Sequence, residues 1–362
     1  MPTSEYSLKT NYPNNTNDGD DDDHHRPIIP LDFKSVSKLP DSHTWVLTHP
    51  NPLSNSESIP VIDLSDPNAI SLMRDACEKW GIFHVTHHGF PSQLLYDVEL
   101  QCRRLFSLPA DQKLRAIRSL NSLSGYGLSR MSTFFPKRMW SEGFTVVESP
   151  LEHAHQLWPH DRQQRDYFCN VMESCQKEMS RLAEHMMGLM FRSLGLSQQD
   201  SKYAKPKYGY KTSHGPLQLN SYPVCPDPTK AMGLAAHTDS SLLTLLCQTS
   251  SAKGLQVHKE GIGWVPVHAV YGALVVNVGD LMQILSNGRF KSVLHRAVVN
   301  KTHHRLSVAY FYGPPKDVKI EPLIQLTDIN HPPLYRPITW KEYLHIKANH
   351  FHKALEFIRR AQ

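Results

Sequence analysis

Three stretches in the first half of the chain carry apolar residues at helical spacing. They span 68–80, 91–106 and 161–194, and a repeat near 3.6 residues predicts an amphipathic helix in each. The apolar positions of the first stretch are Ile70, Met73, Ala76, Cys77 and Trp80. Pro91 suits the first turn of the second helix, because a proline there lacks only a donor that has no helical partner anyway.

Short apolar runs separated by turns dominate the sequence from about residue 206. Two further runs, at 59–64 and 82–85, predict strands in the first half. The strands expected in the second half span 217–220, 242–247, 255–258, 264–267, 274–278 and 305–312. Many short strands joined by turn dipeptides such as Gly279-Asp280 and Asn287-Gly288 are typical of a sandwich or barrel. The pattern indicates an α+β fold with a jelly-roll core, a double-stranded β-helix, buttressed by helices from the N-terminal region and the C-terminus.

Four segments follow from these patterns. The expected organisation is a largely disordered acidic and polar tail at 1–58, a mixed helical region at 59–205, the jelly-roll core at 206–338 and a C-terminal helix at 339–362. The tail is rich in Asn, Asp, Ser and Pro, a composition that buries too little apolar surface to fold alone. Within the mixed region, the stretch from 119 to 149 lacks a clear period and is expected to be irregular.

Composition narrows the classes of function. A chain of 362 residues, 40% of them hydrophobic, can bury a large core. The charge of +5 is not bunched with aromatic residues, which argues against a nucleic-acid partner. No apolar run approaches the roughly 18 residues of a membrane span, and the first residues do not resemble a secretory signal. Six cysteines without a C-x-x-C pair indicate reduced thiols. A cytoplasmic monomer is therefore the expectation.

His237-Thr238-Asp239, followed far downstream by His295, is the first motif with a chemical meaning. Two imidazoles and one carboxylate occupy one face of an octahedral Fe(II) and leave three positions open. On a β-strand, residues i and i+2 share a face, so His237 and Asp239 can meet one metal ion. The tripeptide alone is weak evidence, because 22 histidines produce such sequences by chance. Its place among the motifs described next gives it weight.

Arg305-Leu306-Ser307 follows ten residues after His295. The same strand rule places the Arg305 guanidinium and the Ser307 hydroxyl side by side. A planar guanidinium donates two hydrogen bonds to a carboxylate, and the hydroxyl adds a third. We expect this pair to hold the distal carboxylate of 2-oxoglutarate while the keto-acid end of that molecule chelates the iron.

From Ile59 to the C-terminus, the chain resembles the plant soluble Fe(II)- and 2-oxoglutarate-dependent dioxygenases. The stretches that carry the resemblance are 220–228, 237–239 and 305–311, together with His295. By that resemblance the iron ligands are His237, Asp239 and His295, and the 2-oxoglutarate contacts are Arg305, Ser307, Tyr222 and, nearby, Asn220. The resemblance also implies O₂ as oxidant and ascorbate as reductant.

Two narrower stretches, 139–145 and 232–244, resemble the members of this family that act on gibberellins. The implied activity is 3β-hydroxylation of inactive gibberellin precursors to bioactive gibberellins, with release of succinate and CO₂. An apolar cavity with a few polar anchors suits such a rigid acid. The side chains expected to form this pocket are Trp140 and Phe144 as walls and Arg130, Lys137 or Arg138 as the cation for the substrate carboxylate.

Three alternatives stay open at this point. A gibberellin 2- or 20-oxidase or a flavonoid dioxygenase would keep the metal and co-substrate residues and differ around 130–146 and 232–248. A zinc hydrolase can use the same three ligands, but it needs a general base beside the metal-bound water and has no use for Arg305 and Ser307. A hormone-binding module on the same scaffold would need no redox metal.

Overall fold

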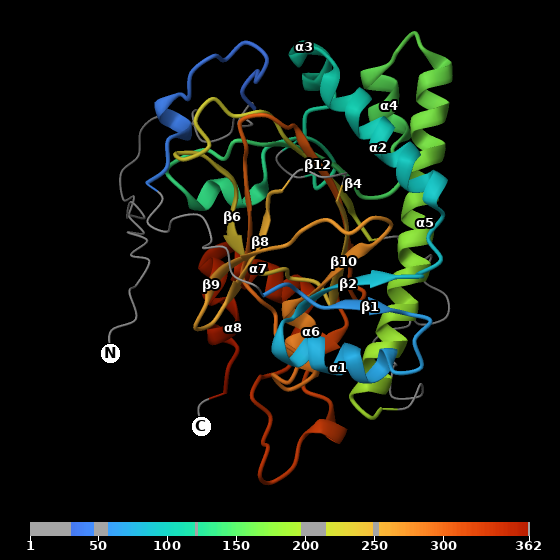
Figure 1. Cartoon of the computed structure of the whole chain (residues 1–362), viewed down its shortest axis with the longest axis vertical. Coiled ribbons are helices and arrows are strands. Elements are labelled where there is room, and N and C mark those ends of the chain that lie inside the picture. The colour runs from blue at the N-terminus through green and yellow to red at the C-terminus, as the bar shows by residue number, and fades with distance from the viewer. Residues whose placement is uncertain (1–29, 47–56, 120–121, 197–214, 249–252, 361–362) are drawn as a thin grey trace.

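Two β-sheets packed face to face form the centre of the molecule in the computed structural model, which describes residues 30–46, 57–119, 122–196, 215–248 and 253–360 (Figure 1). The larger sheet has the order β1 (Val61–Asp63), β2 (Ile82–Thr86), β10 (Leu274–Val278), β7 (Leu243–Gln248), β12 (Arg305–Tyr312), β5 (Leu217–Tyr222), β4 (Glu142–Val146) and β3 (Gly125–Gly127). The smaller sheet has the order β6 (Met232–His237), β11 (His295–Val298), β8 (Leu255–Lys259) and β9 (Gly263–Pro266). A separate pair joins β13 (Lys319–Ile320) and β14 (Ile338–Thr339).

Apolar side chains from both sheets meet in the space between them. Leu246, Val275 and Ala309 come from the larger sheet, and Leu255 and Val257 come from the smaller one. Because side chains alternate between the two faces of a strand, each strand gives every second residue to this interior. The two-sheet core with surrounding helices confirms the predicted α+β class.

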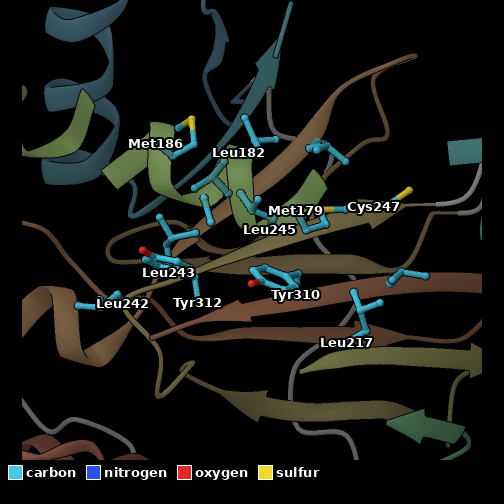
Figure 2. Close-up of a cluster of buried hydrophobic side chains, with 14 of the residues drawn as sticks. Met179, Leu182, Met186, Leu217, Leu242, Leu243, Leu245, Cys247, Tyr310 and Tyr312 are labelled. Atoms are coloured by element: carbon cyan, nitrogen blue, oxygen red, sulfur yellow. The ribbon is translucent and has the colours of Figure 1, made fainter. Parts of the chain in front are cut away.

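Helices cover the other face of the larger sheet. The long helix α5 (Arg162–Ser193) contacts both α2 (Ser92–Ser107) and α1 (Ala69–Lys79) (Figure 1). In Figure 2 the α5 side chains lie over the strands, and the labelled residues of this cluster are Met179, Leu182, Met186, Leu217, Leu242, Leu243, Leu245, Cys247, Tyr310 and Tyr312. The Met-rich stripe of α5 is therefore core packing, in keeping with the adaptable shape of methionine.

The remaining helical elements are short. They are η1 (Asp41–His43), α3 (Ala110–Leu114), η2 (Arg130–Phe134), α4 (Leu151–Leu157), α6 (Asp280–Leu285), η4 (Ile324–Leu326), α7 (Trp340–His350), η5 (Phe351–Lys353) and α8 (Ala354–Phe357). The expected single helix at the C-terminus is broken at Phe351, whose φ of 47° lies in the left-handed region that ends a helix. The segment after α7 therefore turns back on itself.

The three helices predicted in the first half are confirmed as α1, α2 and α5. Two of the predicted features are wrong. The stretch expected to be irregular contains β3 and β4, and Gly279-Asp280 begins α6 instead of forming a turn. Strand β3 has two glycines among its three residues, and all five residues of β4 are buried, so neither strand shows the alternation that predicts a strand.

Part of the predicted tail is ordered. The rings of Phe33 and His43 lie 4.9 and 5.7 Å from the ring of Trp140, centroid to centroid. Leu31, Val36 and Leu39 pack against the same buried cluster. These apolar residues fix segment 30–46 on the core, so this part of the stretch predicted to be largely disordered is ordered. Residues 1–29 and 47–56 of the predicted tail lie outside the described residues.

Candidate metal centre and co-substrate site

His237 and His295 face each other across two paired strands. His237 is the last residue of β6, His295 is the first of β11, and the register places them directly opposite. Their ring centroids are 4.2 Å apart. Asp239 lies in the turn after β6, not on the strand as the i, i+2 argument assumed, and its Oδ1 is 3.7 Å from His237 Nε2 and 3.6 Å from His295 Nε2. Among the described residues, no other group of three His, Cys, Asp or Glu offers ligand atoms this close.

Hydrogen bonds aim the three ligand atoms at a common point. The Nδ1 of His237 donates to the Ala235 carbonyl at 2.8 Å, and the Nδ1 of His295 lies 3.3 Å from the Val293 carbonyl. A carbonyl can only accept, so each ring carries its proton on Nδ1 and keeps a lone pair on Nε2. Asn277 Nδ2 donates to Asp239 Oδ2 at 3.2 Å, which leaves Oδ1 for a metal.

Burial keeps this site in the form that binds a cation. His237, Asp239 and His295 are all buried. Burial, reinforced by His295, lowers the pKa of His237 well below its usual value, so the imidazole stays neutral. Burial alone would raise the pKa of Asp239, but the two imidazoles and the hydrogen bonds from Thr244 and Asn277 lower it. Ligand atoms about 2.1 Å from one ion stand about 3 Å apart at a right angle, so small shifts suffice to bind it.

Arg305 begins β12 and lies opposite Tyr222 of β5, while Ser307 lies opposite Asn220. The Arg305 side chain is 2% exposed. Its Nη2 donates to Gln248 Oε1 at 3.1 Å, and its guanidinium lies 5.0 Å from the centroid of the Tyr222 ring. Its Nε and Nη1 have no hydrogen-bond partner. Burial lowers the pKa of Arg305, and Tyr222 opposes that shift.

A buried guanidinium with two unpaired donors needs an anion. An unsatisfied buried donor costs about 1–3 kcal/mol, more on a charged group. Among the described residues, no Asp or Glu forms a salt bridge with Arg305, so none of their carboxylates balances its charge. The Ser307 hydroxyl, 3.5 Å from Asn220 Nδ2, stands on the same strand face. The donors of Arg305 and Ser307 thus suit the carboxylate of a bound molecule such as 2-oxoglutarate.

Two glycines make room for these side chains. A Cβ on Gly233 would lie 2.9 Å from Cδ1 of Tyr222, and a Cβ on Gly254 would lie 2.7 Å from Cδ of Arg305. Both distances are shorter than real Cβ contacts, so a side chain at either glycine would displace a residue of the co-substrate pocket. Glycine is therefore needed at both positions because of the close approach of neighbouring groups.

Comparison with known proteins assigns the chain to a protein family. Residues 213–314 match the model of the 2OG-Fe(II) oxygenase superfamily, and residues 59–164 match that of the non-haem dioxygenase in morphine synthesis N-terminal region. Gibberellin 3-beta-dioxygenase 3 of Arabidopsis thaliana is 52% identical over 92% of this chain and 95% of its own length. Gibberellin 3-beta-dioxygenase 1 of Pisum sativum is 50% identical over 91% of this chain and 89% of its own length. The chain belongs to the 2OG-Fe(II) oxygenase superfamily.

A solved structure of this superfamily has the same fold. The crystal structure of JOX2 in complex with 2OG, Fe and JA superposes with a TM-score of 0.76 at 30% identity, over 90% of this chain and 95% of that one. The jelly-roll expectation is thereby confirmed. The protein is an Fe(II)- and 2-oxoglutarate-dependent dioxygenase. In the described part of the chain, no helix combines the length and the apolar character needed to cross a bilayer.

The two aromatic residues predicted to line the oxygenase pocket belong to different buried clusters. Trp140 is fully buried, and its Nε1 donates to the Pro223 carbonyl at 3.1 Å. Phe144 is fully buried on the helix side of the larger sheet, with its ring 6.3 Å from that of Phe168 on α5. Position 144 lies opposite Leu219, which also belongs to the helix-side cluster, so Phe144 points away from the metal side. Trp140 belongs instead to the buried cluster that contains Tyr222, so its role as a pocket wall stays a prediction.

Two of the three basic residues predicted to anchor a substrate carboxylate contact the N-terminal segment. Lys137 Nζ donates to the Asp41 carbonyl at 2.8 Å. The backbone N–H of Arg138 donates to the Ser42 carbonyl at 2.7 Å, and its charge acts on His43 of the same segment. The side chain of Arg130 lies outside the described residues. The contacts of Lys137 and Arg138 are thus with the N-terminal segment.

Sequence reasoning missed the residues that support the site. Asn277 fixes the Asp239 carboxylate, and Gln248 binds Arg305. Asn277 had a signal, because it is a buried polar residue in the otherwise apolar strand Leu274–Val278. Gln248 and Gly254 had none, since their roles depend on strand pairing between segments far apart in the sequence.

Proposed function

We propose that this oxygenase hydroxylates a gibberellin at its 3β carbon, converting inactive precursors to bioactive gibberellins with release of succinate and CO₂. The observation that carries the chemistry is the buried Arg305 with two unpaired donors on the same sandwich interior as the His-Asp-His cluster. The substrate rests on the two relatives named above, which share half of their residues with this chain over nearly its whole length.

In this proposal, His237, Asp239 and His295 bind Fe(II). When bound, the ion supplies the activation of O₂ that is coupled to the oxidative decarboxylation of 2-oxoglutarate, with ascorbate as reductant. The backbone carbonyls of Ala235 and Val293 keep both imidazoles in the tautomer that presents Nε2. The chain thereby provides one face of ligands and leaves the opposite positions to the co-substrate and O₂.

Arg305 and Ser307 hold the distal carboxylate of 2-oxoglutarate, with Tyr222 and Asn220 beside them. Burial raises the pKa of Tyr222, opposed by the charge of Arg305 and by hydrogen bonds with Arg305 and Ser307. The phenol therefore stays protonated at neutral pH and can donate to an oxygen. These side chains orient the co-substrate, which matters because the oxidant attacks whichever C–H bond is held nearest.

An apolar cluster beside His237 suits the hydrocarbon skeleton of a gibberellin. Ala235 lies on the same face of β6 as His237, and its backbone N–H lies 3.4 Å from the sulfur of Met139. Met139, Met232 and Ala235 are buried together, with Phe135 packed against them. Met139, Met232 and Ala235 come from the 139–145 and 232–244 stretches that carried the substrate prediction, so we expect them to face the substrate.

A zinc hydrolase is a weaker candidate. Such an enzyme needs a carboxylate or imidazole free to act as base beside the metal-bound water. Among the described residues, the only His, Asp or Glu side chains in the metal cluster are the three ligands. A hydrolase would also leave the unpaired donors of Arg305 without a role. A hormone-binding module would not explain the metal ligands, since binding alone needs no redox metal.

The test is an anaerobic preparation of the protein mixed with Fe(II), 2-oxoglutarate, ascorbate and a nineteen-carbon gibberellin lacking the 3-hydroxyl group. After exposure to air, products are followed by mass spectrometry and succinate is measured. One added oxygen at the 3β position with equimolar succinate is the expected result. The His295→Ala variant serves as the control without metal.

Each other result of this assay favours a different function. Oxygen added at the 2 position, or oxidation at carbon 20 of a twenty-carbon gibberellin, identifies the corresponding gibberellin oxidase. Succinate without any modified gibberellin discards the hormone and favours another substrate such as a flavonoid. The absence of succinate with every substrate discards the oxygenase.

We also propose that the enzyme is a cytoplasmic monomer that binds neither nucleic acid nor membrane. All six cysteines are free and buried, as in proteins of reducing compartments. Light scattering gives the mass in solution, and cell fractionation gives the compartment. A dimer mass or recovery in a membrane fraction would contradict this part of the proposal.

A further inference from the structure

The ammonium group of Lys347 reaches the turn between two of the proposed metal ligands. Lys347 lies on α7, more than a hundred residues downstream of that turn. Its Nζ donates to the carbonyl and to the hydroxyl of Thr238, each at 2.7 Å, and to Oδ2 of Asp280. Thr238 is the residue between His237 and Asp239. The three donors of the ammonium are therefore all used, two on Thr238 and one on Asp280 of α6.

Asp280 closes the other side of the turn. Its backbone N–H donates to the Asp239 carbonyl at 2.7 Å. Its Oδ2 accepts hydrogen bonds from the Thr238 hydroxyl at 3.1 Å and from the Tyr343 hydroxyl at 2.7 Å. The backbone on either side of Asp239 is thus held by Lys347 and Asp280, which are paired with each other.

This ion pair is more than a surface contact. The Lys347 and Asp280 side chains are 14% and 1% exposed. Removing such charges from water is expensive, and well-packed apolar residues often stabilise a fold as well or better. The need to attach α7 to the core therefore does not by itself explain why a charged pair is buried here, because apolar residues would attach the helix as well. Its hydrogen bonds instead end on the backbone that carries the metal ligands.

We propose that Lys347 is a positioning residue of the metal centre, so that the C-terminal helix forms part of the machinery that holds the metal. The inference rests on the proposed metal site. Lys347 fixes the backbone of Thr238, and through it the separation and the direction of the His237 and Asp239 side chains. Groups that orient metal ligands in this way change metal affinity by about 10- to 100-fold when they are removed.

Electrostatics and positioning predict opposite effects of removing this charge. The Lys347 ammonium donates to Thr238, the residue between His237 and Asp239, so its positive charge also repels a cation bound there. Replacing Lys347 by a neutral residue removes that repulsion and leaves the Asp280 carboxylate nearby, which by charge alone tightens cation binding. By contrast, if the Thr238 backbone is no longer held in place, cation binding becomes weaker. The sign of the change therefore separates the two roles.

The experiment measures Co(II) binding to the purified protein by absorption titration, without 2-oxoglutarate or substrate, in wild type, Lys347→Met and Lys341→Met. Lys341 is an exposed lysine on the same helix and serves as the matched control. We expect Lys347→Met to bind Co(II) at least about tenfold more weakly and Lys341→Met to bind it like wild type. Circular dichroism and thermal unfolding of the metal-free chains check that each variant is folded.

Unchanged or tighter Co(II) binding in folded Lys347→Met would overturn the inference. If Lys347→Met does not fold, Lys347→Gln, which keeps two donors without the charge, replaces it under the same criteria. The His295→Ala variant tells this failure apart from a failure of the metal site. If wild type binds Co(II) no more tightly than His295→Ala, the metal site itself is wrong.

Discussion

Replacing Arg305 by Met should have opposite effects on the free protein and on co-substrate binding. In the free protein, Arg305 is a buried cation whose Nε and Nη1 lack partners. Methionine fills a similar volume without a charge. We therefore expect Arg305→Met to leave the metal-free, ligand-free protein as stable as wild type or slightly more stable, while 2-oxoglutarate binding collapses.

The magnitudes follow from the contacts. Two unsatisfied donors cost about 2–6 kcal/mol in the free protein, and their removal recovers that cost. The substitution loses the hydrogen bond to Gln248, about 1.5–3 kcal/mol for a charged donor, and the contact with the Tyr222 ring, about 0.5–1 kcal/mol. These gains and losses nearly cancel, so we expect the free energy of unfolding to stay within about 1 kcal/mol of the wild-type value. For the complex, a buried carboxylate left without its cation costs about 3–5 kcal/mol, or roughly 100- to 5,000-fold in Kd.

Two assays measure the two effects. Urea unfolding of the ligand-free protein, in a buffer without carboxylate anions, gives the stability. Calorimetric titration of 2-oxoglutarate with Mn(II) in place of Fe(II) gives the Kd without turnover. Arg296→Met is the matched control, because Arg296 is also buried, binds Gln256 at 2.7 Å and lies 4.1 Å from the Trp264 ring centroid, but follows His295 on the opposite strand face.

The control variant should lose stability and keep its affinity for 2-oxoglutarate. A structural arginine at position 305 would behave in the same way. If Arg305→Met loses 3 kcal/mol or more of unfolding free energy and binds 2-oxoglutarate like wild type, the assignment of Arg305 to the co-substrate is refuted.

Three further predictions test other parts of the molecule. His295→Ala should abolish succinate formation while the circular dichroism spectrum stays that of wild type; any retained turnover contradicts its role as a metal ligand. Burial, with the Arg138 charge, lowers the pKa of His43 to about 4, so the unfolded chain gains a proton below pH 6.5 that the folded chain does not. Going from pH 7.5 to 5.5 should therefore remove about 1.3 kcal/mol of unfolding free energy through this residue, and His43→Phe should reduce the pH dependence of urea unfolding by that amount. Lys113→Met should destabilise the protein by about 3–5 kcal/mol in the same assay, because it leaves the Glu142 carboxylate, 2.6 Å from Lys113 Nζ, buried without its cation; a loss below 1 kcal/mol would show that the pair is not isolated from water.

Periodicity was sufficient for the long elements and failed for the short ones. The helical repeat predicted α5 to within a residue at each end, because a stripe of buried side chains over 32 residues leaves a clear pattern. Strand β4 has five residues, all buried on both faces, so it shows no alternation. Without β4 in the prediction, nothing indicated that Phe144 faces the helices. The wrong pocket wall is therefore a consequence of the missed strand.

The sequence predicted those site residues that belong to short, recognisable motifs. His237, Asp239 and His295 were named from residue type and spacing, and the structure brings their ligand atoms within 4.8 Å of one another. The residues that orient them were not predicted. Asn277 and Lys347 come from a strand and a helix distant in the sequence, and only the three-dimensional packing places them beside the ligands.

Strand β12 links the co-substrate site to the helical layer. Arg305 and Ser307 face the sandwich interior, while Leu306, Val308 and Tyr310 alternate with them and are buried on the helix side. Because β12 is paired with β5 on one side and β7 on the other, it cannot shift along its axis without breaking both ladders. The helix-side residues of β12 also pack against α5, which keeps the strand from moving out of the plane of the sheet (Figure 2). The position of the guanidinium is therefore set by packing on the far side of the sheet, which explains how a buried cation is held in place before its anion arrives.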